Sequence, residues 1–247
     1  MKNIQQWRPS KFIIRDGVLR GSRNPSDLQV SSRLVADIVA SYYQNYLPAY
    51  AKGNLIDLGC GKVPLYSVYR DHVDATTCVD WEHSMHQNPF LDQTCDLNET
   101  LPFPDKTFDT ILLSDVLEHI SEPVKLWHEM ERILRPGGAL VLNVPFFYKL
   151  HEIPHDYFRY TEFALRKFAA NCNLSVVVLE PMGGIPEIVT DLLSKLFYKI
   201  PLAGKMFSGA SQLMCRVFLK TTVGRKISRK TSAQFPLGYF MVAVKNG

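Results

Sequence analysis

An alternation of short apolar runs with helical patterns constrains the fold more than any other feature of the sequence. Each run is five or six residues long and is bounded by turn-forming residues, which is typical of buried strands. Between the runs, apolar residues recur every three or four positions, as in helices that pack on a sheet. The predicted strands are Asn54–Leu58, Ala75–Val79, Phe108–Leu113, Ala139–Val144, Leu174–Leu179 and Tyr239–Val244.

Three helices are predicted, one before the first strand and two between later strands, at Ser31–Leu47, Glu122–Leu134 and Thr161–Asn171. Thr161 suits the N-cap position, and Pro136-Gly137-Gly138 predicts a stop and a turn after the second helix. Strands that alternate with helices of this length predict a doubly wound α/β domain with a mostly parallel, Rossmann-like sheet.

A glycine turn follows the first predicted strand. In doubly wound sheets, ligands bind at the carboxyl ends of the strands, and the glycines of Gly59-Cys60-Gly61 let the backbone approach a ligand closely. Asp57, just before this turn, suits a ligand with a cationic sulfonium or ammonium group. Pro64 occupies the place of the third glycine of a dinucleotide fingerprint, which disfavours a nicotinamide oxidoreductase.

Two more aspartates follow the next predicted strands. Asp80 lies 23 residues after Asp57, a spacing that suits a carboxylate accepting hydrogen bonds from ribose hydroxyls. Asp96 follows a shorter strand candidate and can pair with an adenine amino group, while Leu97 covers the ring. Any one of these aspartates could be an ordinary cap or turn residue. Three at successive strand ends favour a cofactor that contains adenosine.

These segments resemble the class I S-adenosylmethionine-dependent methyltransferases of the small-molecule type. The matching segments are Leu55–Gly61, Leu101–Asp109, Val116–Ile120 and Arg135–Gly138. The resemblance implies a seven-stranded sheet whose last strand runs antiparallel. It also implies S-adenosyl-L-methionine as the cofactor. No metal site is expected, because no cluster of carboxylates can be picked out on the acceptor side. The cofactor-binding residues expected from the motifs and the resemblance are Asp57, Gly59, Cys60, Gly61, Asp80, Trp81, Asp96, Leu97, Ser114 and Asp115.

The acceptor side is expected beyond the fourth and fifth strands. Methyl transfer from a sulfonium is an in-line displacement, and a hydroxyl or protonated amine acceptor also needs a base. His155 is the first candidate for this base and His119 the second, while Arg159 is expected to hold an anionic group. Each has a structural alternative: His119 can cap or pack, and Arg159 can pair with Asp156 or Glu162.

A marked charge asymmetry distinguishes the last part of the chain. Residues 1–191 hold 18 Lys and Arg and all 24 Asp and Glu, whereas residues 192–247 hold 10 Lys and Arg and no acid. Within 186–220, two helical patterns carry apolar faces flanked by lysines and arginines. This segment could form a lid over the acceptor, a homodimer interface, or a peripheral contact with an anionic membrane. Nucleic acid is an improbable partner, because aromatic residues are not interleaved with the charges.

The predicted organisation is an N-terminal extension (1–30), a cofactor-binding core (31–185), a basic amphipathic helical insertion (186–232) and the final strand of the core (233–247). The sequence contains no signal peptide and no apolar run long enough to span a bilayer, so we expect a cytoplasmic protein, with membrane association at most peripheral. The five scattered cysteines predict neither disulfides nor a zinc site.

Two functions remain open. The first is methyl transfer to a small-molecule, glycan or lipid-linked acceptor. The second is a non-catalytic protein that binds S-adenosylmethionine and uses the helical segment to contact a membrane or a partner.

Overall fold

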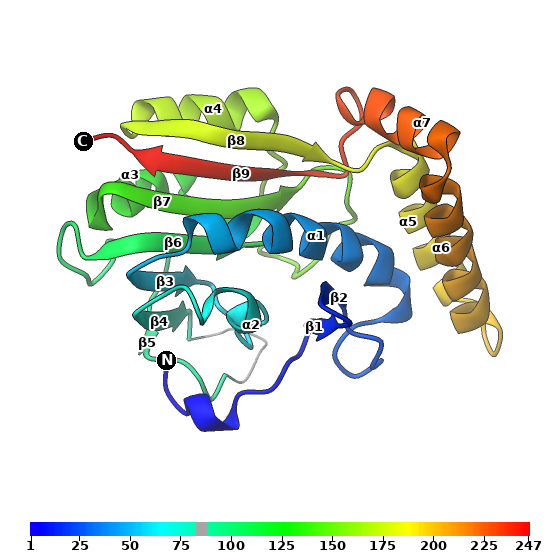
Figure 1. Cartoon of the computed structure of the whole chain (residues 1–247), viewed down its shortest axis with the longest axis horizontal. Coiled ribbons are helices and arrows are strands. Elements are labelled where there is room, and N and C mark those ends of the chain that lie inside the picture. Colours follow the sequence, from blue (N-terminus) through cyan, green and yellow to red (C-terminus); the bar gives the residue numbers. More distant parts are fainter. Residues whose placement is uncertain (83–87) are drawn as a thin grey trace.

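A seven-stranded sheet forms the centre of the computed structural model, which describes residues 1–82 and 88–247 (Figure 1). The strand order is β5-β4-β3-β6-β7-β9-β8, and only β9 runs antiparallel to its neighbours. This confirms the predicted fold class. The strands are β3 (Asn54–Leu58), β4 (Ala75–Asp80), β5 (Gln93–Thr94), β6 (Phe108–Ser114), β7 (Leu134–Pro145), β8 (Leu174–Met182) and β9 (Gly238–Lys245).

Helices cover both faces of the sheet, with α1 (Arg33–Tyr50) and α2 (Tyr66–Tyr69) on one face and α3 (Pro123–Ile133) and α4 (Glu162–Asn171) on the other (Figure 1). Because side chains alternate along a strand, neighbouring residues enter opposite layers of the core. Leu55 packs with the α1 layer and Ile56 with the α3 layer. The continuous apolar runs of the sequence reflect this burial on both faces.

The predicted element boundaries are close to the observed ones, with one difference at β7. The turn expected at 136–138 lies inside this strand, which begins at Leu134, directly after α3. The register between β6 and β7 shifts between Phe108 and Thr110, so an irregular stretch of strand replaces the expected loop. Thr161 caps α4 as predicted, because its side chain accepts a hydrogen bond from the backbone N–H of Ala164.

The first 30 residues contain regular structure that the sequence pattern did not indicate. They form a short 3-10 helix (Ile4–Gln6) and an antiparallel hairpin of β1 (Phe12–Arg15) and β2 (Val18–Gly21). Trp7 and Phe12 are buried in the layer that contains α1. The N-terminal segment is therefore packed on the core.

Three helices lie between β8 and β9, one more than predicted: α5 (Ile185–Tyr198), α6 (Gly204–Lys220) and α7 (Thr222–Ser232). We call these the inserted helices. α5 starts where β8 ends, so they stand beyond the carboxyl edge of the sheet, at the right of Figure 1. Among the described residues, no helix is long and apolar enough to cross a membrane.

Candidate active site

A cavity of about 680 Å³ opens at the carboxyl edge of the sheet, where β3, β4 and β6 end. This volume lies in the range of pockets that enclose a small-molecule ligand. Nine of the ten residues predicted to bind the cofactor line the cavity, and they come from four separate segments. These residues are Gly59, Cys60, Gly61, Asp80, Trp81, Asp96, Leu97, Ser114 and Asp115.

The glycine turn after β3 forms one wall of this cavity in a conformation that only glycine adopts readily. Gly59 has φ +69° and Gly61 has φ +48°. A Cβ atom on Gly59 would lie 2.5 Å from Cγ2 of Val116, another residue of the cavity wall. The backbone at Gly59 therefore packs against Val116 at a distance that leaves no room for a side chain.

Asp80 connects this turn to the end of β4. The backbone N–H of Gly61 donates a hydrogen bond to one carboxylate oxygen of Asp80 (3.0 Å), and the N–H of Trp81 donates to the other (2.9 Å). These bonds fix the carboxylate at the cavity wall.

Asp57 is the tenth predicted residue, and it lies next to the cavity without lining it. Its side chain is almost completely buried at the end of β3. Burial, and secondarily the neighbouring Asp80, raises the pKa of Asp57 to about 8. A cationic group in the cavity would offset the free-energy cost of ionising this buried carboxyl group and would favour the carboxylate form.

The N-terminal segment contributes to the cavity wall, which sequence reasoning missed. Lys11 lies in the wall, and its ammonium is 2.7 Å from the carboxylate of Asp115 at the end of β6. Burial opposes ionisation of Asp115, but Lys11 and the side chain of Asn143 more than offset it, so the pKa of Asp115 is lowered. No motif marks Lys11, because the contact depends on the packing of the hairpin.

His119 and His155, the two candidate bases, both line the cavity. The backbone carbonyl of His155 is 2.7 Å from Nδ1 of His119, so Nδ1 carries the proton and donates it to this oxygen. The imidazole of His155 stands edge-on to Trp81, with 5.1 Å between ring centroids, and its Nδ1 is 3.1 Å from the hydroxyl of Tyr157.

Arg159, which is expected from the sequence to hold an anionic group of the acceptor, does not line the cavity. Both terminal nitrogens of its guanidinium donate hydrogen bonds to the carboxylate of Asp156, at 2.5 and 2.7 Å. Arg159 therefore makes the ion pair with Asp156 that the sequence offered as an alternative to binding the acceptor.

A second cavity of about 210 Å³ adjoins the first, and Lys11, Asp115 and Glu152 line both. Glu118 and His151 line this smaller cavity, while the neighbouring His119 lines the larger one. The loop that carries His151 follows β7 and is held against another 3-10 helix, Leu117–His119, which contains Glu118. The N–H groups of Tyr157 and Phe158 donate hydrogen bonds to the Glu118 carbonyl.

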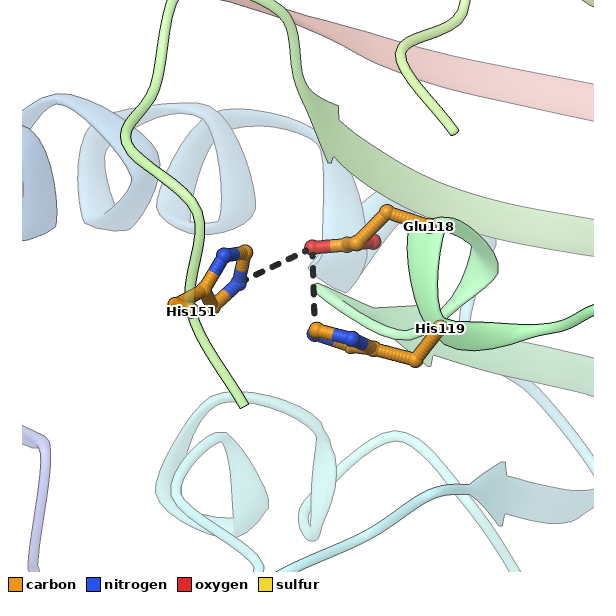
Figure 2. Close-up of side chains that lie close together, drawn as sticks. All are labelled: Glu118, His119 and His151. Carbon is orange, nitrogen blue, oxygen red and sulfur yellow. Dashed lines mark ion pairs between the residues drawn. The ribbon is translucent and has the colours of Figure 1, made fainter. Parts of the chain in front are cut away.

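Glu118, His119 and His151 point toward one another (Figure 2), and we call them the histidine–glutamate cluster. Oε1 of Glu118 is 3.6 Å from Nε2 of His151 and 3.8 Å from Nε2 of His119. Burial raises the pKa of Glu118. Burial alone would lower the pKa of His151, but Glu118 raises it above the usual value. The motif Val116–Ile120 contained Glu118, but nothing in the sequence pairs it with His151.

The larger cavity fits S-adenosylmethionine. It has the volume of a nucleotide-sized ligand, a backbone cradle at Gly59 that a Cβ would fill, and acidic side chains at or just after the ends of β4, β5 and β6. A dinucleotide would need the helix after the turn to receive a pyrophosphate, whereas α2 is a single turn of four residues.

Comparison with known proteins agrees with this geometry. Residues 56–142 match the family model described as a methyltransferase domain. The phosphatidylethanolamine N-methyltransferase of Cereibacter sphaeroides is 28% identical over 159 residues, which cover 54% of this chain and 76% of that protein. Several other curated methyltransferases align over only 17% to 58% of their own length.

Solved structures share the fold. An S-adenosylmethionine-dependent methyltransferase from Mesorhizobium loti superposes with a TM-score of 0.56 and 14% identity, covering 86% of this chain and 100% of that one. The Haemonchus contortus phosphoethanolamine N-methyltransferase 2, in complex with S-adenosyl-L-methionine, superposes with a TM-score of 0.55 and 14% identity. The superposition covers 91% of this chain and 58% of that one. These matches agree with the glycine turn, the aspartates that follow it and the seven-stranded sheet. Residues 56–142 form a methyltransferase domain, and the chain has the fold of the class I S-adenosylmethionine-dependent methyltransferases, with a cavity that fits S-adenosylmethionine.

Proposed function

We propose that the chain methylates the polar part of a lipid or lipid-linked acceptor at an anionic membrane surface. The observation that carries this proposal is the arrangement of the inserted helices: the fully buried side chains between α5 and α6 are polar, whereas many apolar side chains of these helices are exposed. A helical layer packed against a core in water has the opposite distribution.

Polar groups lie between α5 and α6. Ser194, Ser208 and Gln212 are at most 1% exposed. The hydroxyls of Ser194 and Ser208 are 2.7 Å apart, and the side-chain amide of Gln212 donates to Ser194 Oγ at 2.7 Å. Gln212 also binds the start of α1 and the chain just before it, because it accepts from the N–H of Leu34 and donates to the carbonyl of Val30. These bonds hold the helices without using their apolar side chains.

The apolar side chains of the inserted helices are exposed instead. Leu196 is 61% exposed, Met206 65% and Met214 73%. Others that are more than a third exposed are Ile185, Val189, Leu192, Leu193, Phe207, Leu213, Val217, Phe218, Val223 and Ile227. Such an apolar surface marks a contact with a partner or a membrane.

The charge of the same helices selects an anionic lipid surface as the partner. Residues 192–247 contain no acid, and each exposed lysine or arginine near an anionic surface contributes roughly 1 kcal/mol. The exposed basic residues of the inserted helices are Lys199, Lys205, Lys220, Arg225, Lys226, Arg229 and Lys230. Apolar and basic side chains together are the composition of interfacial helices.

The inserted helices are in contact with the acceptor side of the cavities. Nζ of Lys195 on α5 lies 3.6 Å from the ring centroid of Tyr148, whose side chain lines the smaller cavity next to His151. No residue of the inserted helices lines either described cavity, which argues against the lid alternative. A surface bound by these helices would therefore lie beside the cavities without closing them.

In the proposed reaction, Asp57, Asp80 and Asp96 hold the cofactor by its charged group, ribose and adenine. The acceptor nucleophile displaces the methyl group in line, and catalysis comes largely from positioning the two reactants. We assign the base to His155, because Nε2 of His119 is turned toward Glu118. The name of the Cereibacter relative, phosphatidylethanolamine N-methyltransferase, supports an acceptor with a lipid head group.

Co-sedimentation with phosphatidylglycerol vesicles at low salt tests the membrane contact. We expect the wild-type protein to pellet, and a Leu192→Gln/Leu196→Gln/Met214→Gln variant to bind at least ten times more weakly. Val124→Gln is the control, because Val124 is 57% exposed on α3, away from the inserted helices. The absence of wild-type binding, or equal loss in the control, would refute the contact.

Transfer of label from methyl-tritiated S-adenosylmethionine to a total membrane lipid extract tests the reaction. We expect label in the organic phase, and a reduction of at least tenfold for His155→Gln with unchanged cofactor affinity. Label confined to water-soluble acceptors would contradict the lipid assignment. Cofactor binding without transfer to any fraction would favour the non-catalytic alternative.

A further inference from the structure

We infer that the histidine–glutamate cluster binds a divalent transition-metal ion, with Glu118, His119 and His151 as its protein ligands. One ligand atom from each of these side chains lies within 4.8 Å of the other two. Two imidazoles and one carboxylate form a ligand set that suits transition metals such as zinc, manganese, cobalt or iron.

The separations within the cluster fit an ion better than direct hydrogen bonds. Nε2 of His151 and of His119 are 3.6 and 3.8 Å from Oε1 of Glu118, beyond hydrogen-bonding distance. Two ligand atoms that each bind an ion at about 2.0–2.1 Å with tetrahedral geometry are roughly 3.3–3.4 Å apart. A contraction of a few tenths of an ångström would bring each of the two Glu118–histidine separations to this value, and the ligand atoms of the two histidines already lie within 4.8 Å of each other.

The cluster also contains buried polar atoms that lack partners. Among the described residues, neither carboxylate oxygen of Glu118 has a hydrogen-bond partner, although the side chain is completely buried. Nε2 of His119 is likewise buried without one. Leaving such groups unpaired costs about 1–3 kcal/mol each, and more for a charged group, so their accumulation at one point indicates a missing partner.

The outer nitrogens of the two histidines have the partners that metal-binding histidines usually have. Nδ1 of His119 donates to the carbonyl of His155 at 2.7 Å. Nδ1 of His151 is 3.2 Å from the carboxylate of Asp156, which is fixed by Arg159. These contacts turn both Nε2 atoms toward Glu118, with their lone pairs available for an ion.

The location determines what the ion would contact. His119 lines the cofactor-sized cavity, and Glu118 and His151 line the smaller cavity beside it. With three protein ligands, the ion would retain coordination positions directed at the acceptor side. An oxygen atom of the acceptor bound there would experience a lowered pKa.

Equilibrium dialysis of the untagged, full-length protein against Co²⁺, without donor or acceptor, tests the site. We expect about one bound Co²⁺ per chain, with visible absorption bands of a nitrogen- and oxygen-ligated ion. Competition with Zn²⁺, Mn²⁺ and Mg²⁺ ranks the metals. Because this readout does not involve methyl transfer, it can fail while the proposed function holds, and the reverse is equally true.

Variants locate the ion. We expect Glu118→Gln and His151→Ala to weaken Co²⁺ binding at least 100-fold. Asp156→Asn, which alters the partner of the outer nitrogen of His151 and leaves the three proposed ligands in place, is expected to weaken it 10- to 100-fold. His72→Ala, an exposed histidine at the end of α2, is the control. The inference would be overturned if the wild type took up less than one Co²⁺ per chain at near-saturating Co²⁺. It would also be overturned if folded Glu118→Gln bound Co²⁺ as well as the wild type.

Discussion

The ammonium of Lys11 lies 2.7 Å from the carboxylate of Asp115, although 104 residues separate the two along the chain. Both residues line the larger cavity. The contact joins the N-terminal hairpin to the end of β6, so a segment outside the recognisable motifs helps to set the charge of the cofactor site. Removing either partner should therefore affect cofactor binding as well as folding.

We expect Lys11→Met to reduce the free energy of unfolding by about 1 kcal/mol, since the pair is partly exposed to solvent. Its affinity for S-adenosylmethionine should also fall. Chemical denaturation and calorimetry measure the two effects, and a double-mutant cycle with Asp115→Asn isolates the coupling. Lys62→Met, at another residue of the cavity wall, is the control, and additive effects of Lys11→Met and Asp115→Asn would contradict the expectation.

The raised pKa of Asp57, about 8, predicts a pH dependence with a definite sign. The folded protein retains a proton that the unfolded chain releases near pH 4, so stability falls as the pH rises from about 4 to 8 and then levels off. The slope is at most about 1.4 kcal/mol per pH unit. Unfolding measured across this range should show the decline in the wild type, and a smaller one in Asp57→Asn.

The same carboxyl group should release a proton when the cofactor binds near neutral pH, because the cation favours the ionised form. Calorimetry in buffers of different ionisation enthalpy measures this release. A wild-type protein that binds S-adenosylmethionine with no proton release at pH 7 would contradict the role proposed for Asp57.

Gly59→Ala should reduce cofactor affinity at least tenfold, because the added Cβ would lie 2.5 Å from Val116. Positive φ alone adds a strain of about 1 kcal/mol for alanine. Gly137→Ala separates the two effects, since Gly137 has φ +73° and a Cβ added there would meet nothing within 4 Å beyond its chain neighbours. We expect this control to lose stability but retain affinity, as determined by calorimetry.

Gln212→Leu should loosen the inserted helices, because it removes four hydrogen bonds of this side chain, those with Leu34, Val30, Ser194 and Ser208. Each unpaired buried group costs about 1–3 kcal/mol. Limited proteolysis should show faster cleavage within 185–232. Gln234→Leu, at an exposed position, should leave the pattern unchanged, and an unaltered pattern in Gln212→Leu would show that these bonds do not hold the helices.

The sequence predicted the core of the fold because the signal there is local. Three of the five residues of Asn54–Leu58 are apolar and turn-forming residues flank it, and Gly59 and Gly61 after it indicate a turn whose backbone conformation favours glycine. The nine predicted residues of the cavity wall follow from this, since strand ends in a parallel sheet meet at one edge.

Long-range packing determined what the sequence could not reveal. Lys11 reaches Asp115 only because Phe12 anchors the hairpin in the core. His151 meets Glu118 only because the loop after β7 folds back on the 3-10 helix. The apolar faces of the inserted helices were visible as periodicity, but periodicity does not say which face of a helix is buried. Here Ser194 and Gln212 are buried and Leu196 is exposed.

The position of β9 between β7 and β8 has a consequence for the order of folding. β8 is at the edge of the sheet and pairs only with β9, which the ribosome makes after the inserted helices. Until residues 238–245 emerge, β8 has no strand to pair with. The apolar side chains of α5–α7 are already present on the nascent chain at this stage. Productive synthesis therefore depends on a late strand closing a gap in the sheet, and on the helices avoiding premature association in the meantime.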